Sequence, residues 1–298
     1  MAVDRAALGP LLASAFWGGM YVVSKWGFSV VPPLTLGFLR VVLGGVVLYT
    51  VVRATSDVTV EPADYRQFAV LGAWVAATIA TQFVGTELTN ASQGSLLTIL
   101  TPVFTVGLGA AVLGERVGRR KTVGVGIAVV GTLLVVAGQY DLRALLGGGA
   151  TGSAAGVALL VVASLCWAGY TVWGVPVVRR HSGLTAATYS CLAAAAMLAP
   201  LSAVELYLQR PPLADLLAPR ALLTVLYLGL AATAAAWVLW YRGLETLPAG
   251  TVAVFFFAQP VVGAVLGAAF LDEAIGPWFA LGGVVMAAGV WLVSTARA

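Results

Sequence analysis

Long apolar runs, each of about 20 residues, follow one another along almost the whole chain of 298 residues. A helix of about 20 residues rises about 30 Å, which matches the hydrocarbon core of a bilayer. The alternating pattern of membrane barrel strands is absent. Only 9% of the residues are charged, against about 25% in soluble domains. The sequence therefore predicts an all-α integral membrane protein.

We predict ten transmembrane helices joined by short connections. They cover approximately residues 7–28, 34–52, 66–86, 94–113, 121–139, 153–176, 185–207, 221–242, 250–271 and 277–295. If the N-terminus is cytoplasmic, most Arg and Lys residues outside the spans face the cytoplasm, and only Arg143, Arg210 and Arg220 face out. Such a bias sets the orientation of membrane proteins. We therefore expect a multi-pass protein of the cell inner membrane with both termini in the cytoplasm.

An internal repeat relates the two halves of the chain. The segment around Trp17 returns around Trp167, and five of its residues recur at one constant offset. A slightly larger offset matches a second set, in which Gly85, Pro102, Glu115, Gly124 and Gly131 correspond to Gly243, Pro260, Glu273, Gly282 and Gly289. A unit of five spans thus occurs twice, and because five is odd the second unit enters the membrane the opposite way up. We predict two inverted five-helix repeats around a central cavity, residues 1–146 and 153–298, joined by an external glycine-rich linker, residues 147–152.

The order of parts within each unit resembles the EamA family of the drug/metabolite transporter superfamily. The first helix carries a mid-membrane Trp, the fourth has Pro-Val at its centre, and Gly-Glu or Asp-Glu precedes a glycine-spaced fifth. The resemblance extends from about Ala7 to Val293. It implies a ten-helix fold whose halves enclose a central cavity. It also implies export of amino acids or related metabolites.

Trp17 and Trp167 fall near the middle of their spans, and Tyr21 shares a helix face with Trp17 because four residues separate them. We expect these aromatic side chains to line a cavity. The alternatives are that they only fill packing space or belong to an aromatic belt at the membrane interface. Pro102 and Pro260 lie at the centres of their helices, where each removes a backbone hydrogen bond. Broken helices at matching positions of two repeats indicate a transporter's binding site, although a kink can also serve packing alone.

These positions and their polar neighbours form the predicted substrate-binding set. Its members are Trp17, Tyr21, Gln82, Thr98, Thr101, Trp167, Tyr170, Phe256 and Gln259, with predicted helix kinks at Pro102 and Pro260.

Four ionisable residues, Lys25, Arg40, Glu87 and Glu205, fall in the outer third of the predicted spans. Charges within spans are costly and are functional candidates by default. Lys25 and Arg40 could pair with Glu87 or Glu205 in a structural ion cluster. They could instead form an external gate, contact a substrate carboxylate, or extend to the lipid headgroups.

The composition excludes several other classes. The lone histidine, His181, is expected in a solvated basic loop, so the sequence predicts no metal site and no cofactor. The basic residues are spread over short loops, which does not favour nucleic acid as a partner. A membrane enzyme would need paired carboxylates, a His cluster or a nucleophile with its base. None of these is visible, so no catalytic residue is predicted.

The sequence thus favours a secondary transporter that exports small neutral or zwitterionic metabolites, such as amino acids, by alternating access. The partners expected are a small-molecule substrate and the lipid bilayer, and a monomer is compatible with this fold. The alternative within transport is broad-specificity efflux of drugs or lipophilic compounds. Lipophilic cations would favour a carboxylate near the midplane, and no span carries one there.

Overall fold

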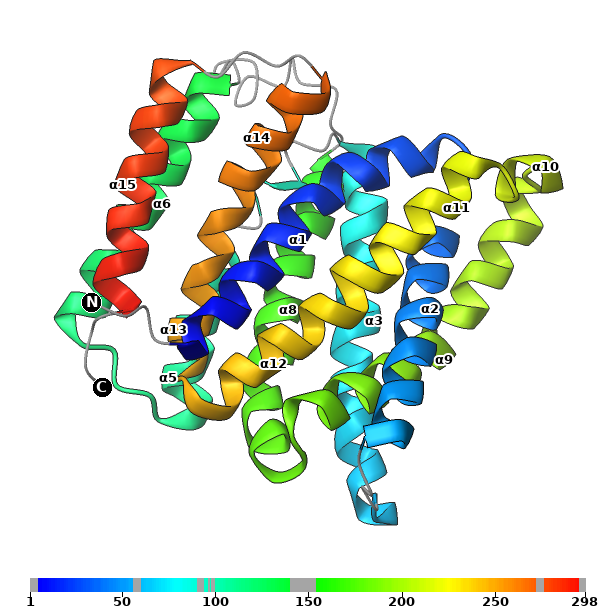
Figure 1. Cartoon of the computed structure of the whole chain (residues 1–298), viewed down its shortest axis with the longest axis horizontal. Coiled ribbons are helices and arrows are strands. Elements are labelled where there is room, and N and C mark those ends of the chain that lie inside the picture. Colours follow the sequence, from blue (N-terminus) through cyan, green and yellow to red (C-terminus); the bar gives the residue numbers. More distant parts are fainter. Residues whose placement is uncertain are drawn as a thin grey trace.

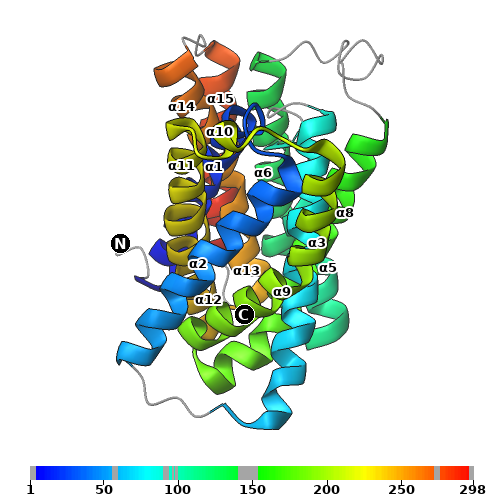
Figure 2. The ribbon, with the colours of Figure 1, turned by 90° about the vertical axis from the view of Figure 1, so that its right-hand side faces the viewer.

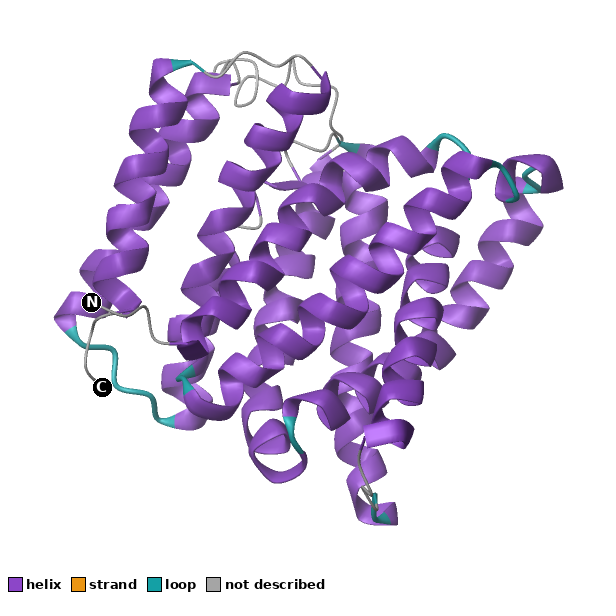
Figure 3. Ribbon diagram, in the orientation of Figure 1, coloured by secondary structure: helices purple, strands orange, loops and turns teal. Residues whose placement is uncertain are grey.

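The computed structural model describes residues 5–55, 60–89, 94–95, 97, 100–139, 154–271 and 276–294. Within these ranges every regular element is helical (Figure 3). In chain order the elements are α1 (Arg5–Phe28), α2 (Pro33–Thr55), η1 (Pro62–Asp64), α3 (Tyr65–Leu88), α5 (Leu100–Leu113), α6 (Arg119–Gln139), α8 (Ala154–His181), α9 (Gly183–Gln209), α10 (Leu213–Leu216), α11 (Pro219–Leu226), η2 (Tyr227–Ala235), α12 (Ala236–Thr246), α13 (Ala249–Val254), η3 (Phe255–Phe257), α14 (Ala258–Leu271) and α15 (Pro277–Ser294).

Helical stretches long and apolar enough to cross a membrane occur six times in the described residues. They are Ala7–Phe28, Pro33–Thr55, Tyr65–Leu88, Ala155–His181, Gly183–Gln209 and Pro219–Thr246. Shorter apolar helices cover Leu100–Leu113, Ala249–Gly263 and Ala280–Val293. Large apolar side chains such as Val46, Leu223 and Val284 lie on the outer surface, where lipid tails would contact them. The chain is a multi-pass membrane protein.

The helices pack into one bundle, which Figures 1 and 2 show from two directions. Helix α1 packs against α12 and α14, while α3 packs against α8 and α9. Helices α6 and α15 pack against each other at one edge (Figure 1). Their contact is close because Gly124 lies against the backbone of Gly289, where a Cβ on Gly124 would lie 3.0 Å from the Gly289 carbonyl oxygen. The glycines that recur in the last span of each half thus serve helix packing.

The element η2 is a π-helix in the middle of an otherwise α-helical span. The Ala236 N–H donates to the Ala231 carbonyl, and the Thr233 hydroxyl donates to the Leu228 carbonyl at 2.7 Å, five residues back in both cases. Such wide turns are often found at functional sites. The Ala232 carbonyl oxygen of this wide turn accepts hydrogen bonds from side chains of two other helices, Trp17 of α1 and Arg40 of α2.

The ninth predicted span is also interrupted. A 3-10 turn, η3, separates α13 from α14, and Pro260 is the third residue of α14. Proline has no N–H, so the carbonyl of Phe256 loses its usual α-helical partner. Pro102 lies near the first described residue of α5. The interruption brings Phe256 and Gln259 to the interior of the bundle.

Candidate functional site

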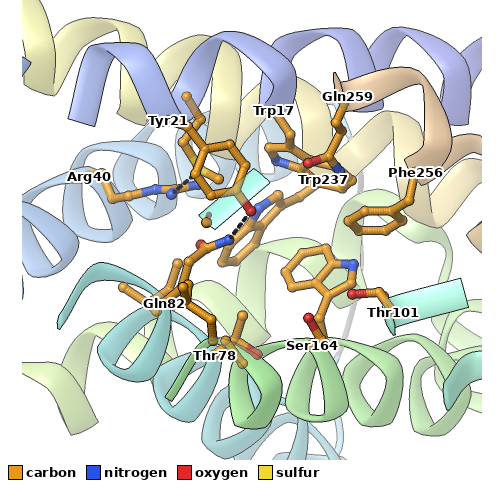
Figure 4. A pocket seen from close by; sticks show the side chains of 16 residues that line it. Trp17, Tyr21, Arg40, Thr78, Gln82, Thr101, Ser164, Trp237, Phe256 and Gln259 are labelled. Carbon is orange, nitrogen blue, oxygen red and sulfur yellow. Dashed lines mark hydrogen bonds between the residues drawn. The ribbon is translucent and has the colours of Figure 1, made fainter. Parts of the chain in front are cut away.

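A cavity lies between α1, α2, α3, α5, α8, α12 and the η3–α14 junction (Figure 4). The space between its lining atoms amounts to ≈ 470 Å³, part of which is open to solvent. The described residues that line it are Trp17, Met20, Tyr21, Arg40, Thr78, Ile79, Gln82, Gly94, Thr101, Leu160, Ala163, Ser164, Trp167, Trp237, Phe256 and Gln259.

Aromatic rings form one wall of the cavity. The rings of Trp17 and Trp167 meet edge to face with centroids 5.0 Å apart, and Phe256 stacks on Trp17 at 5.3 Å. Trp240 lies behind them, with its centroid 4.7 Å from that of Phe256. Each contact fixes the neighbouring ring. The wall is therefore preorganised to hold an apolar group or, by cation–π attraction, an ammonium group.

Several polar atoms at the cavity have no hydrogen-bond partner in the described part of the chain. These are the indole nitrogens of Trp167 and Trp237 and both amide atoms of Gln259. Gln259 is only 1% exposed, and an unpaired buried polar group costs free energy. By contrast, the Trp17 indole N–H donates to the Ala232 carbonyl at 2.8 Å. The unpaired atoms are available to a bound ligand.

Arg40 brings a positive charge to the same cavity from α2, and its side chain is 1% exposed. Its Nε donates to the Thr233 hydroxyl and its Nη2 to the Ala232 carbonyl, both at 3.0 Å. The third donor, Nη1, lies 2.9 Å from the Met20 sulfur, and the guanidinium lies 5.4 Å from the Phe83 ring centroid. The π-helix η2 therefore supplies the oxygen acceptors that hold Arg40.

No carboxylate occurs among the described residues that line the cavity. Nor does any group of three or more His, Cys, Asp or Glu side chains gather as a metal site in the described ranges. The cavity offers hydrogen-bond donors, aromatic faces and one cation. Such a site is suited to binding an organic molecule.

The model of the EamA-like transporter family matches residues 5–137 and residues 154–295. The chain belongs to the EamA-like transporter family. It is 25% identical over 287 residues to the uncharacterized transporter YwfM of Bacillus subtilis, covering 96% of this chain and 92% of YwfM. The EamA-like fold and the transporter class are thus established for this chain.

Two further EamA-like relatives have names that state a cargo. A probable amino-acid metabolite efflux pump of Salmonella typhimurium is 24% identical over 295 residues, covering 95% of this chain and 92% of that protein. A probable terminal-alkyne amino-acid exporter of Streptantibioticus cattleyicolor is 26% identical over 205 residues, covering 68% of this chain and 64% of that protein. A solved crystal structure superposes with a TM-score of 0.78 at 21% identity over 99% of each chain, which supports the fold alone.

The structure brings most of the predicted substrate-binding residues of this EamA-like protein to one place. Those that line the cavity are Trp17, Tyr21, Gln82, Thr101, Trp167, Phe256 and Gln259. Tyr170 does not line it, because it packs behind Trp167 with its hydroxyl 3.2 Å from Ser190. Thr98 lies outside the described residues.

The four ionisable residues form no ion pair with one another in the described ranges. Lys25 instead donates to the backbone carbonyls of Glu87 and Thr89 at 3.3 and 3.1 Å, at the end of α3. The side chain of Glu87 is exposed. Arg40 was expected in the outer third, but its guanidinium shares the Ala232 carbonyl with Trp17. Its long side chain thus reaches the depth of the aromatic wall.

Glu205 binds the beginning of α2. Its carboxylate accepts from the backbone N–H groups of Leu34 and Thr35 at 3.0 and 2.7 Å, and from the Thr35 hydroxyl at 2.8 Å. A carboxylate at a helix N-terminus satisfies free N–H groups and complements the helix dipole. Glu205 therefore fixes α2, the helix that carries Arg40, to α9.

Glu115 makes a similar contact between α5 and α13. Gly114, at φ 65°, ends α5 and turns the chain. The Glu115 carboxylate then accepts from the N–H groups of Ala249 and Gly250 at 2.7 and 3.2 Å and lies 3.3 Å from Lys121. This contact joins α5 to the start of α13, at the end of the bundle where α1 begins and α15 ends (Figure 1).

The expected solvated loop at His181 is wrong. His181 ends α8 with a side chain 9% exposed, and its Nε2 lies 3.2 Å from Asp64 Oδ1. Asp64 also pairs with Arg180 at 3.1 Å. The element η1, which the sequence pattern did not reveal, brings the acidic partner to this helix end.

Sequence reasoning missed Trp237, Ile79 and Thr78 in the cavity wall. A signal was available for two of them, because the offset that matches Gly85 with Gly243 also matches Ile79 with Trp237. Thr78 lies four residues before Gln82 and so shares its helix face. Ile79 lies three residues before Gln82 on the same face, and the repeat offset then leads from Ile79 to Trp237.

Proposed function

We propose that this chain is a secondary transporter that exports small zwitterionic or neutral metabolites, with amino acids as the main class, by alternating access. The observation that carries the proposal is the cavity inside a membrane-embedded helical bundle, with unpaired donors beside a preorganised aromatic wall. The names of the Salmonella and Streptantibioticus relatives supply the cargo class. A monomer is compatible with this proposal.

Alternating access rests on the proposal that residues 1–146 and 153–298 form two inverted repeats of five helices, with 147–152 as the external linker. Helix packing supports this proposal. When each helix is replaced by its counterpart in the other half, one pair of contacting helices becomes another pair that is also in contact. The pair α3 and α8 corresponds to α12 and α1, and the pair α5 and α8 corresponds to α14 and α1. The family model also matches a range in each half.

Two hydrogen bonds repeat in the same way. The Gln82 amide donates to the Tyr21 hydroxyl at 2.9 Å. At the corresponding positions of the second half, the Trp240 indole N–H donates to the Thr171 hydroxyl at 3.2 Å. Each bond joins the third helix of a half to its first helix. Two halves built alike and inserted in opposite directions can rock around a cavity at their interface.

The charge of the cavity lining disfavours the alternative cargo, lipophilic cations. An efflux protein for lipophilic cations would be helped by a carboxylate at the cavity, and the described lining residues include none. Arg40 adds a positive charge, which disfavours a cationic cargo further. Zwitterionic and neutral molecules fit this electrostatic environment better.

The proposal is tested by transport with the purified protein in lipid vesicles. Vesicles are loaded with each of the common L-amino acids in turn, and exit of a labelled copy is followed with and without an imposed proton gradient. We expect exchange for a subset of apolar amino acids, and empty vesicles provide the baseline. Transport of quaternary ammonium dyes without any amino-acid exchange would instead favour lipophilic-cation efflux.

A further inference from the structure

Arg40 is a buried cation without a counter-ion in the described part of the chain. None of the ion pairs found there includes it, and the described lining of its cavity contains no carboxylate. Its acceptors are one carbonyl oxygen, one hydroxyl and one thioether sulfur. A charge buried in a bilayer protein without a partner of opposite sign is costly. The resting state of the site therefore lacks a negative charge.

The guanidinium also keeps donor capacity. It has five N–H donors in a planar fork, and three of them account for the contacts to Thr233, Ala232 and Met20. Sulfur is a weak acceptor, so the Nη1 contact to Met20 is the easiest to replace. The terminal nitrogens can thus donate to a new acceptor while Nε and Nη2 stay held by η2.

The other end of the cavity has a different chemistry. Figure 4 shows Arg40 at one end, whereas Phe256 and Thr101 lie at the other, with Gln259 beside them. The amide of Gln259 has neither its donor nor its acceptor satisfied in the described residues. Its oxygen and the aromatic faces can receive an ammonium group. The cavity is therefore polarised, with the cation at one end and an acceptor among aromatic rings at the other.

We propose that Arg40 binds the carboxylate of the transported substrate, which makes the carboxylate the obligatory recognition group of this transporter. The inference deepens the proposed function and rests on it. A carboxylate matches the fork of an arginine with two charge-assisted hydrogen bonds. The single cation among the described lining residues suits one monoanionic group better than a phosphate dianion. Amino acids would then lie with the carboxylate toward α2 and the ammonium and side chain toward η3 and α14.

A purely structural role for Arg40, as a tie between α2 and η2, predicts something different. Loss of that tie would weaken the fold and lower transport of every cargo equally. Loss of a carboxylate contact would lower only the preference for the acid over an uncharged copy of it. The acid-to-amide ratio therefore separates the two roles.

The test uses the common L-amino acids and their carboxamides, which differ only at the carboxylate. Binding to the purified full-length protein is measured by thermal shift, and transport is measured in vesicles. We expect the wild-type protein to prefer the acid by at least about tenfold, which corresponds to about 1.4 kcal/mol. In Arg40→Gln the preference should fall to near one. Arg40→Lys, which keeps the charge but not the fork, should retain part of it.

Lys25→Gln is the matched control, because it removes a cation of α1 that bonds only to backbone carbonyls in the described residues and does not line the cavity. Its acid-to-amide ratio should equal that of the wild type. If Arg40→Gln does not fold, the acid-to-amide ratios of the wild-type protein and of Arg40→Lys are compared instead, and they test the assignment of Arg40.

Each remaining outcome has a defined meaning. Equal binding of acids and carboxamides by the wild type, or a preference that survives in Arg40→Gln, would overturn the assignment of Arg40. Absence of binding by every acid would overturn it too. Acids that bind with the expected preference but are not transported would refute the proposed export function and leave the role of Arg40 standing.

Discussion

Trp17 and Arg40 donate hydrogen bonds to one acceptor, the carbonyl oxygen of Ala232, at 2.8 and 3.0 Å. The two donors come from different helices, α1 and α2, and they meet at the π-helix η2. A shared acceptor couples the position of the aromatic wall to the position of the buried cation. Substitutions at this junction should therefore affect stability and transport in distinguishable ways.

The two repeat-related tryptophans should respond differently to loss of the indole N–H. Trp17→Phe removes the bond to Ala232 and should lower stability by about 0.5–1.5 kcal/mol beyond the cost of the smaller ring. Trp167→Phe removes an N–H that has no partner in the described residues. It should therefore cost less stability, while transport falls several-fold. Thermal unfolding in detergent and vesicle exchange measure the two effects, and an identical pattern for both variants would contradict the assignment.

Gln259→Leu should yield a protein that is more stable and less active. The amide of Gln259 is buried with both polar atoms unpaired in the described residues, and an unsatisfied buried group costs about 1–3 kcal/mol. Replacing it with an apolar side chain of similar size relieves that cost and removes a substrate contact. The same substitution at Gln82, whose amide donates to Tyr21, should instead lower stability. A destabilised Gln259→Leu would show that its amide is satisfied in the native protein.

Glu205→Gln should destabilise the bundle without changing the acid-to-amide ratio. It weakens three hydrogen bonds at the start of α2, and bonds to a charged group contribute about 1.5–3 kcal/mol each. We expect a clear drop in the unfolding midpoint. Glu87→Gln is the control, since the Glu87 side chain is exposed and surface changes usually stay within about 0.5 kcal/mol. Equal midpoints for both variants would rule out the capping role of Glu205.

Glu115→Gln should open the cavity more often at the end where α5 meets α13. The substitution weakens the contacts to Ala249 and Gly250 and the pairing with Lys121. A cysteine at the buried position Thr105, in a chain whose two native cysteines are replaced by alanine, reports the opening. Its labelling by a polar maleimide in inside-out vesicles should become several-fold faster. An unchanged rate would mean that Glu115 does not hold this end closed.

Topology gives a fifth test. We propose insertion in the cell inner membrane with both termini in the cytoplasm. The start of α1 and the end of α15 lie at the same end of the bundle (Figure 1), which supports placing both termini on one side, and the distribution of Arg and Lys favours the cytoplasm. In intact spheroplasts an impermeant thiol reagent should label Arg210→Cys and not Arg119→Cys. Labelling of Arg119→Cys alone would reverse the orientation.

The sequence indicated the cavity best at positions where the same residue type occurs in both copies of the internal repeat. Trp17 and Trp167 recur at one offset, and Pro102 and Pro260 at another, so depth and symmetry together indicated one site. Tyr170 lies three residues after Trp167 and so shares its helix face, which is the only sequence signal that favours the cavity for it. That spacing does not tell which flank of a buried face meets the cavity and which meets α9.

Arg40 and η2 show what the sequence could not reveal. The position of a residue within a predicted span gives the membrane depth of its Cα atom. An arginine side chain is long enough to place its charge at a different depth. No proline occurs in Tyr227–Ala235. The Ala232 carbonyl within it accepts from Trp17 and Arg40, which are 215 and 192 residues away along the chain. Local pattern carries no information about such partners.

The π-helix η2 changes the direction in which the side chains after it point. Each residue of an α-helix accounts for about 100° of turn, and a wide turn holds an extra residue. Every side chain that follows η2 is therefore rotated relative to an uninterrupted helix, including Trp237 at the cavity and Trp240 behind it. If η2 became a regular α-helix while α11 stayed in place, these two rings would turn by about 100° about the helix axis. The wide turn thus determines which face of α12 meets the cavity.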